Sequence, residues 1–223
     1  MPIAFEQLSS PTLRVRIAEK LREAILNGTL REGERLVERK LAAEFATSLT
    51  AVREALIELE SDGFVVKKPN SSTYVTKLTW EAAQHVFAVR RLLEVFAIEE
   101  AARLATPEDI ASLEGLYLSL LDAARNEDVQ LFIQRDFALH TAIWELARNE
   151  CLSATLRRVA LPIFAASAIR IATRGAFDLA QDAQLHLPLL DAIRLKDPVA
   201  ARKAMEESMQ AWLDQARAHM FGR

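Results

Sequence analysis

The chain has 223 residues, of which 51% are hydrophobic and 26% charged, a composition that excludes a disordered protein and allows one large or two modest domains. No apolar run approaches the roughly 20 residues of a membrane helix, and residues 1–8 carry no signal pattern. The sequence therefore predicts a cytoplasmic protein without a membrane partner. The single cysteine, Cys151, excludes an intrachain disulfide framework and is expected to be a small buried core residue.

The net charge of −3 does not by itself indicate a nucleic-acid partner. Residues 1–78 carry 12 Lys and Arg against 11 Asp and Glu, or +1, whereas the remainder carries 16 against 20, or −4. This asymmetry is small. Any bound DNA must be held by locally arranged cations rather than by the field of the whole protein.

The first elements are expected to be two helices. A stripe of apolar residues at every fourth position predicts a helix that ends near Gly28: Leu13, Ile17, Leu21 and Ile25. A turn around residues 31–33 follows. A short second helix is then predicted from its apolar positions: Leu36, Leu41, Ala42 and Phe45.

A third helix and a hairpin complete the first domain. Thr47 and Ser48 form a natural N-cap for a helix over about 49–62, and Gly63 stands where a left-handed C-cap is needed. Its buried stripe is Val52, Ala55, Leu56 and Leu59. Two β-rich runs, 64–66 and 74–76, flank turn residues. Residues 1–78 are thus predicted to form a winged helix-turn-helix.

From Thr79 onward the β signal almost disappears, and amphipathic helices follow one another. Residues 106–109 form a capping box with proline at the first helical position, and Asp197-Pro198 starts the last helix in a similar way. Residues 79–223 are therefore predicted to form an all-α, antiparallel bundle of six helices. The expected helices are 80–105, 107–125, 129–148, 151–173, 179–196 and 198–219.

The third helix is the candidate DNA-reading element. In a helix-turn-helix, the second helix of the motif enters the major groove and presents its N-terminal residues to the bases. Thr50 points away from the predicted core and Arg53 lies on the flank, where it can pair with guanine or phosphate. Arg39 and Lys40 on the preceding helix are placed to add backbone or groove contacts.

The second domain contains a candidate metal site. Asp136 and His140 share a helix face through their i,i+4 spacing, and aspartate with histidine suits a divalent cation. His186, on a largely apolar helix, is a third candidate. From the residues alone, ordinary surface or core roles for all three stay open.

The first domain resembles the N-terminal domain of the GntR family of bacterial transcription regulators. The resemblance is carried by segments 28–36, 38–42, 48–56 and 59–65, including Val-Arg-Glu-Ala-Leu at 52–56. It implies a homodimer on a short two-fold symmetric operator. By position it implies these DNA contacts: Arg39, Ser48, Thr50, Ala51, Arg53 and the wing tip near Asn70. Two departures are Leu49, where the family usually has arginine, and residues 70–72, where it usually has glycine.

Residues 82–219 resemble the FCD ligand-binding domain of the FadR subfamily, and the short length with six helices is more similar to its VanR-type branch. The resemblance implies an effector cavity with zinc or nickel bound by Asp136, His140 and His186, with Ser208 replacing the family's last histidine. It also implies that Arg90 and Ser208 face the effector, and a guanidinium there suits a carboxylate. The alternative for Arg90 is an exposed charge paired with Glu94.

Together these features predict a DNA-binding transcription repressor, gated by a small carboxylate metabolite, with double-stranded DNA and a second copy of the chain as partners. The alternative is a helical metal-dependent hydrolase or lyase that uses Asp136, His140 and His186 to activate water. That alternative leaves the first 75 residues without a role. The predicted polar set in the core argues against a third hypothesis, a helical protein-interaction module.

Overall fold

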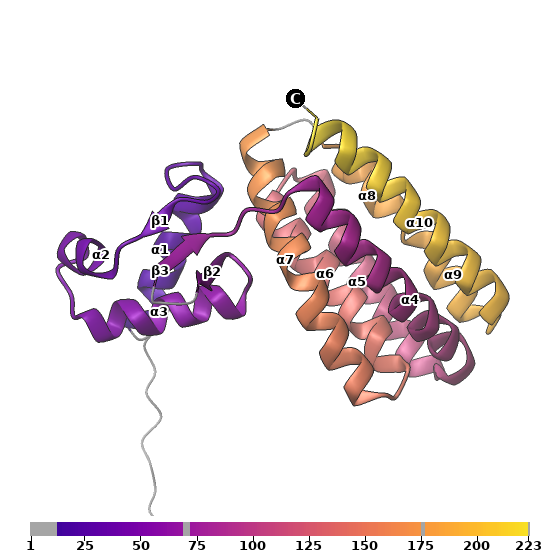
Figure 1. Cartoon of the computed structure of the whole chain (residues 1–223). Helices are drawn as coiled ribbons and strands as arrows, with labels where there is room; N and C mark the ends of the chain where they lie inside the picture. Colours follow the sequence, from indigo (N-terminus) through magenta and orange to yellow (C-terminus); the bar gives the residue numbers. More distant parts are fainter. Residues whose placement is uncertain (1–12, 69–71, 175–176, 223) are drawn as a thin grey trace, which may run out of the picture. The chain divides into compact units, whose positions relative to one another are not determined.

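The computed structural model describes residues 13–68, 72–174 and 177–222. The chain divides into two compact units, with the boundary between Thr76 and Lys77. Helices make up most of both units (Figure 1). The fold class is therefore mainly α, with a small sheet in the first unit, as the sequence predicts.

The first unit is a winged helix-turn-helix. Its three strands form an antiparallel sheet in the order β1-β3-β2, with Val65 opposite Val75 in the hairpin. The elements are α1 (Leu13–Leu26), β1 (Arg35–Leu36), α2 (Glu38–Glu44), α3 (Leu49–Ser61), β2 (Val65–Lys68) and β3 (Ser72–Val75).

Local sequence explains the bounds of α3. The hydroxyl of Ser48 accepts a hydrogen bond from the backbone N–H of Ala51, which satisfies one of the free N–H groups of the first turn. At the other end, Gly63 has a φ of 75°, a left-handed conformation that glycine adopts without a Cβ clash. The apolar faces of α1 and α3 pack on each other, with Ile25 and Leu59 fully buried.

Two details of the first unit differ from the sequence prediction. Leu36 belongs to β1 rather than to the second helix, which begins at Glu38. The strand β1 itself was not expected, because two residues show no alternation that a pattern can reveal. The predicted wing-tip residue Asn70 lies outside the described residues.

The second unit is an all-helical bundle. Helix α4 packs against α6, α7, α9 and α10, and α5 packs against α6 and α8 (Figure 1). Most of the core is aliphatic, and Phe132 and Trp144 are fully buried within it. The helices are α4 (Trp80–Leu104), α5 (Pro107–Arg125), α6 (Val129–Leu146), α7 (Glu150–Arg174), α8 (Leu179–Gln184), α9 (Leu187–Arg194) and α10 (Pro198–His219).

The prediction of six helices is wrong at one place, because the segment expected as one helix over 179–196 is divided. Helix α8 ends at Gln184 and α9 begins at Leu187. Pro188 explains the break, since it has no N–H and its ring would clash with the carbonyl of Gln184, four residues earlier. The break places His186 at the N-cap of α9, facing the bundle interior with 4% exposure.

Two further expectations are corrected in α7. Cys151 is exposed rather than buried, because it lies in the first turn of the helix, and the next residue, Leu152, faces the core instead. Helix α7 is also long and apolar enough to cross a membrane by length and composition. However, 56% of its apolar window is buried inside the protein, as expected for a central helix of a bundle.

Candidate DNA-reading helix and metal centre

Helix α3 presents the predicted DNA-contacting residues at its N-terminal end. Thr50 and Arg53 are exposed and Ala51 is half-buried, whereas Val52 and Ala55 face the core. Ser48 is exposed but also caps the helix. Because the cap uses the hydroxyl as an acceptor, its O–H stays available as a donor to a phosphate oxygen.

Arg53 forms an ion pair with a residue of the preceding helix. Its Nε donates to Glu38 Oε2 at 2.6 Å, and the Arg53 side chain is 61% exposed. Arg39 and Lys40 on α2 are exposed as well, with Lys40 Nζ 3.7 Å from Glu44. Since exposed ion pairs are weak, these cations can exchange their carboxylate partners for DNA phosphates.

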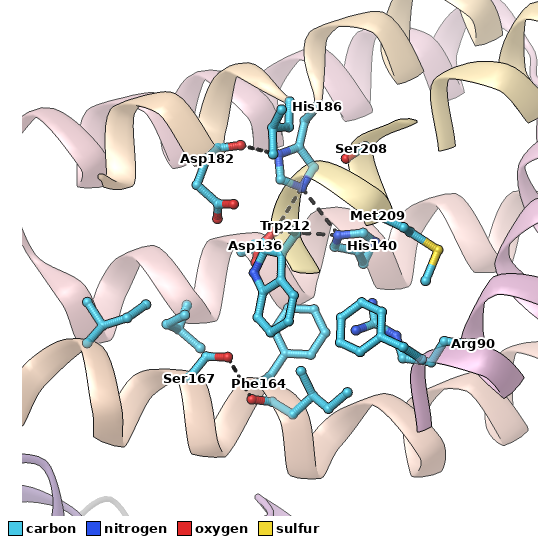
Figure 2. A pocket seen from close by; sticks show the side chains of 15 residues that line it. Arg90, Asp136, His140, Phe164, Ser167, Asp182, His186, Ser208, Met209 and Trp212 are labelled. Atoms are coloured by element: carbon cyan, nitrogen blue, oxygen red, sulfur yellow. Dashed lines mark hydrogen bonds and ion pairs between the residues drawn. The ribbon is translucent and has the colours of Figure 1, made fainter. Parts of the chain in front are cut away.

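The second unit encloses a cavity to which five helices and the α8–α9 break contribute (Figure 2). Arg90 of α4, Ser208 of α10 and the three predicted metal ligands all line it, so the structure brings the predicted sensor residues together. His219 lies outside this cavity lining and is exposed at the end of α10. Apolar side chains form much of the remaining wall: Phe87, Ile133, Ile163, Phe164, Ile171, Leu185, Met209 and Trp212.

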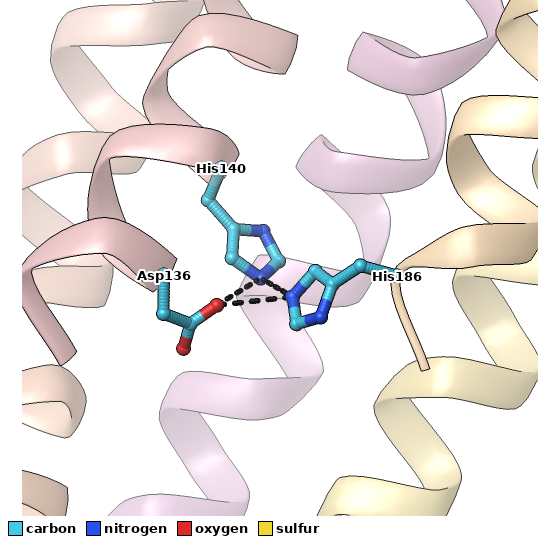
Figure 3. A group of neighbouring side chains, drawn as sticks. All are labelled: Asp136, His140 and His186. Atoms are coloured by element: carbon cyan, nitrogen blue, oxygen red, sulfur yellow. Dashed lines mark hydrogen bonds and ion pairs between the residues drawn. The ribbon is translucent and has the colours of Figure 1, made fainter. Parts of the chain in front are cut away.

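Asp136, His140 and His186 converge inside this cavity (Figure 3). His186 Nε2 lies 3.0 Å from Asp136 Oδ1 and 3.2 Å from His140 Nε2, and His140 Nε2 lies 3.6 Å from Asp136 Oδ1. All three residues are buried. One ligand atom of each lies within 4.8 Å of the others, the arrangement that a single cation requires.

The outer nitrogens of both imidazoles have acceptors beside them. His140 Nδ1 lies 3.2 Å from Glu94 Oε2, and His186 Nδ1 lies 3.2 Å from the backbone carbonyl oxygen of Asp182. Such partners favour the tautomer with the proton on Nδ1, which leaves the Nε2 lone pair free for a metal. Two Nε2 lone pairs and one carboxylate oxygen then face one another, and a cation or a proton between them removes their repulsion.

The electrostatics of the cluster favour a proton on His186 beside Asp136. Burial alone would lower the pKa of His186, but its hydrogen bond to Asp136 and the charge of that carboxylate raise it to about 9. Burial opposes ionisation of Asp136 too, yet the hydrogen bond and charge of His186 lower its pKa. Two imidazoles and a carboxylate are a donor set suited to zinc or nickel, so these residues fit a divalent transition metal.

Arg90 is not the exposed charge that the alternative interpretation describes. It does pair with Glu94, Nε to Oε1 at 2.6 Å, but their side chains are only 5% and 0% exposed. The guanidinium also lies over the rings of Phe87 and Phe164. Burial would raise the pKa of Glu94, but the charges and hydrogen bonds of Arg90 and His140 lower it to about 2. Glu94 is therefore ionised at neutral pH.

Two functional candidates, Glu94 and Asp182, were missed in the sequence. Glu94 contacts Arg90, His140 and the indole N–H of Trp144, whose Nε1 is 3.4 Å from Oε2. Asp182 lines the cavity, and burial with the nearby charge of Asp136 raises its pKa to about 8. The available signal was the spacing Asp182-x-x-x-His186, which repeats that of Asp136 and His140.

A winged helix-turn-helix with exposed cations on its second and third helices, followed by an all-helical domain with a buried polar cavity, is the architecture expected of a two-domain DNA-binding regulator. Two family descriptions match the chain: "Bacterial regulatory proteins, gntR family" over residues 13–75 and "FCD domain" over residues 85–211. The second match alone covers more than half of the chain. The chain therefore belongs to the gntR family of bacterial regulatory proteins, with an FCD domain.

Individual relatives agree with this assignment. The HTH-type transcriptional regulator YieP of Escherichia coli is 29% identical over 95% of this chain and 99% of its own length. The gluconate operon transcriptional repressor of Bacillus subtilis is 30% identical over 61% of this chain and 56% of its own length. The solved structure of Escherichia coli McbR/YncC has the same fold, with a TM-score of 0.70, 24% identity, and coverage of 92% of this chain and 99% of that chain.

Membership in this family establishes a transcription regulator and not an enzyme. The alternative of a metal-dependent hydrolase or lyase therefore finds no support. The described residues do contain a cluster able to hold a metal ion, as the sequence predicts.

Proposed function

We propose that the chain is a repressor that binds a palindromic operator as a homodimer and is gated by a small carboxylate, with zinc or nickel in the sensor cavity. The relative from Bacillus subtilis is named as a repressor, which supports this direction of control. A cytoplasmic location and the VanR-type branch belong to the same proposal. The assignment to this branch is now supported by the short chain rather than by the number of helices, because the break at His186 divides one predicted helix into two.

The observation that carries the sensor proposal is the convergence of Asp136 Oδ1 with the Nε2 atoms of His140 and His186. These three atoms would hold the metal. Ser208 lines the same cavity, where its hydroxyl, a water or an effector oxygen would complete the coordination.

Arg90 would bind the carboxylate of the effector. Its ion pair with Glu94 uses Nε, so Nη1 and Nη2 are the groups that would face the ligand. A guanidinium binds carboxylates through parallel N–H donors, and such bonds are strong in a buried cavity. The bound metal would supply a second positive charge for the same carboxylate.

For the DNA-binding unit, we propose base or phosphate contacts by exposed and half-exposed residues of α2 and α3: Arg39, Lys40, Ser48, Thr50, Ala51 and Arg53. Arg53 is the candidate for base recognition, because a flexible guanidinium near the start of the helix can reach guanine O6 and N7. Asn70 would contact DNA at the tip of the wing. We also propose that the DNA-binding domain spans residues 1–78 and that residues 79–223 bind effector and dimerise.

A second copy is proposed to cover an exposed apolar stripe on α4. Val89, Leu92 and Phe96 share one helix face and are 46%, 75% and 48% exposed. A homodimer is needed to read two half-sites, and an exposed stripe of large apolar residues is the surface that such an interface buries. Leu92→Glu should shift a micromolar dimer to monomer in light scattering, whereas Leu118→Glu on α5, 64% exposed in the wild type, should not. Dimers in both variants would reject this surface.

The repressor proposal is tested with an operator selected from random-sequence duplexes. Operator affinity is then measured by fluorescence anisotropy at fixed salt, with zinc or nickel and a panel of small organic acids. An effector should change the affinity by about 5- to 150-fold, the usual range of coupling between two sites. An operator affinity that no metal and acid combination changes would reject gating, and failure to select any duplex would reject sequence-specific binding.

A further inference from the structure

The carboxylate of Asp182 is a buried group of the cavity that has no role in the proposed metal centre. Its residue is 2% exposed, and its side chain lines the same cavity as the metal cluster. Its backbone carbonyl holds the ring of His186, but its carboxylate oxygen Oδ1 has no hydrogen-bond partner among the described residues. An unsatisfied buried carboxylate oxygen costs free energy unless a ligand supplies a donor.

The position of Asp182 indicates what kind of ligand could supply this hydrogen-bond donor. Asp182 lines the cavity, but it is not among the residues whose ligand atoms lie within 4.8 Å of one another, so it does not belong to the candidate cation site. Figure 2 shows Asp182 and Arg90 on opposite sides of His140 and Asp136. A ligand that spans this space would meet a cationic group at one end and a carboxylate at the other.

The other charged groups of the cavity agree with a ligand that meets Arg90 at one end and Asp182 at the other. Arg90 pairs with Glu94, and Asp136 lies within ion-pair distance of His186, so the carboxylates of Glu94 and Asp136 already have cationic or donor groups beside them. A positive charge beside Asp182, from the metal or from a ligand, favours its ionised form. A ligand with only a carboxylate would leave Oδ1 of Asp182 unsatisfied.

We infer that the effector carries a hydrogen-bond donor, an ammonium or a hydroxyl group, that binds the Asp182 carboxylate while the effector's own carboxylate binds Arg90 and the metal site. This inference rests on the proposed carboxylate effector and specifies its chemical class. Amino acids and hydroxy acids share the required chemistry. The apolar walls formed by Phe164 and Trp212 would take the rest of the ligand.

The test uses the full-length, zinc-loaded protein and acids that differ only at the α-carbon. The probes are propanoate, lactate and alanine, and hexanoate with its 2-hydroxy and 2-amino derivatives. Binding is measured by thermal shift and calorimetry. At least one donor-bearing acid should bind at least tenfold more tightly than the unsubstituted acid of the same length.

Substitutions at Asp182 distinguish the two donors. Asp182→Ala should remove the advantage of the donor-bearing acids, while Asp182→Asn, which keeps an acceptor but loses the charge, should weaken an ammonium ligand more than a hydroxyl ligand. Asp191→Ala on α9 is the control, because Asp191 pairs with Arg194 in a salt bridge between exposed side chains. Circular dichroism and zinc content are recorded for each variant.

Four outcomes would overturn the inference. Equal binding of substituted and unsubstituted acids, or a donor advantage that survives Asp182→Ala, rejects the role of Asp182 but leaves the carboxylate effector intact. Loss of zinc from Asp182→Ala means that the carboxylate serves the cation instead. Binding of none of the acids rejects the carboxylate effector itself, and this inference with it.

Discussion

The two candidate sites of this protein are built in opposite ways. The DNA-reading residues lie on short, consecutive helices and are mostly exposed, whereas the sensor residues come from helices far apart in the sequence and, except for the half-buried Ser208, are buried. In the first site each side chain depends on its position in one helix. In the second, each depends on neighbours from other helices, so a single substitution there should affect both ligand binding and stability.

The largest effect is expected for removal of a metal ligand. His140→Ala should lower metal affinity by more than about 100-fold, because the three-residue cluster loses one of its two imidazoles. Metal content after dialysis against zinc or nickel measures this, with His219→Ala as the control for an exposed histidine. Operator affinity without effector should stay unchanged. Full metal retention in His140→Ala would contradict a metal centre that uses His140.

Next in size is the loss of the buried carboxylate that supports the site. Glu94→Gln leaves the buried Arg90 guanidinium without its charged partner, and it should lower the free energy of unfolding at pH 7 by about 3 kcal/mol. The pKa of Glu94 is lowered to about 2. Its stabilisation is therefore present above pH 4.5 and is lost as the pH falls toward 2.

Urea denaturation of the wild type and Glu94→Gln between pH 7 and pH 3 checks this prediction. The difference between the two proteins should shrink as the pH falls below about 4.5. Glu99→Gln is the matched control on the same helix, because Glu99 pairs with an exposed Arg202 at 2.7 Å. A constant difference across this range would mean that Glu94 acts through packing rather than charge.

A smaller effect, confined to DNA, is expected in the first site. Arg53→Ala should weaken specific operator binding by about 1–3 kcal/mol without changing stability or metal content. A gel-shift titration at fixed salt measures it, and Arg14→Ala on α1 serves as the control for an exposed arginine. Unchanged affinity in Arg53→Ala would assign base recognition to other residues of α3.

The smallest effect is expected for a gain of ligand. Ser208→His places an imidazole where the chain offers a hydroxyl, and it should raise metal affinity by about tenfold, since histidine is the better ligand for zinc and nickel. Ser208→Ala, which adds no ligand, should not raise the affinity. Competition with a coloured chelator resolves such differences. If Ser208→His binds metal no better than Ser208→Ala, position 208 does not face the metal.

Much of the fold could be predicted because its signals are local. The Ser48 cap, Gly63 and the capping box at Thr106 each act within about one turn of chain, and the structure has all of them. The apolar stripe of the first helix lies within that one helix, and all of it but Leu13 is buried. The hydrophobic pattern gave wrong predictions at two places, one where a tertiary contact forms a strand and one where a single proline interrupts a helix. The strand β1 exists through its pairing with β3, and Pro188 divides a segment that is amphipathic throughout.

For the sensor, the sequence by itself determined the i,i+4 pair Asp136 and His140, because helical spacing fixes which side chains share a face. Only the tertiary structure decided that His186 lies 3.2 Å from His140, that the Arg90–Glu94 pair is buried beside them, and that Asp182 lines the same cavity. These residues come from four segments of the bundle, and their proximity depends on how the helices pack. Helix packing depends on the whole core, so it could not be predicted from a local sequence pattern.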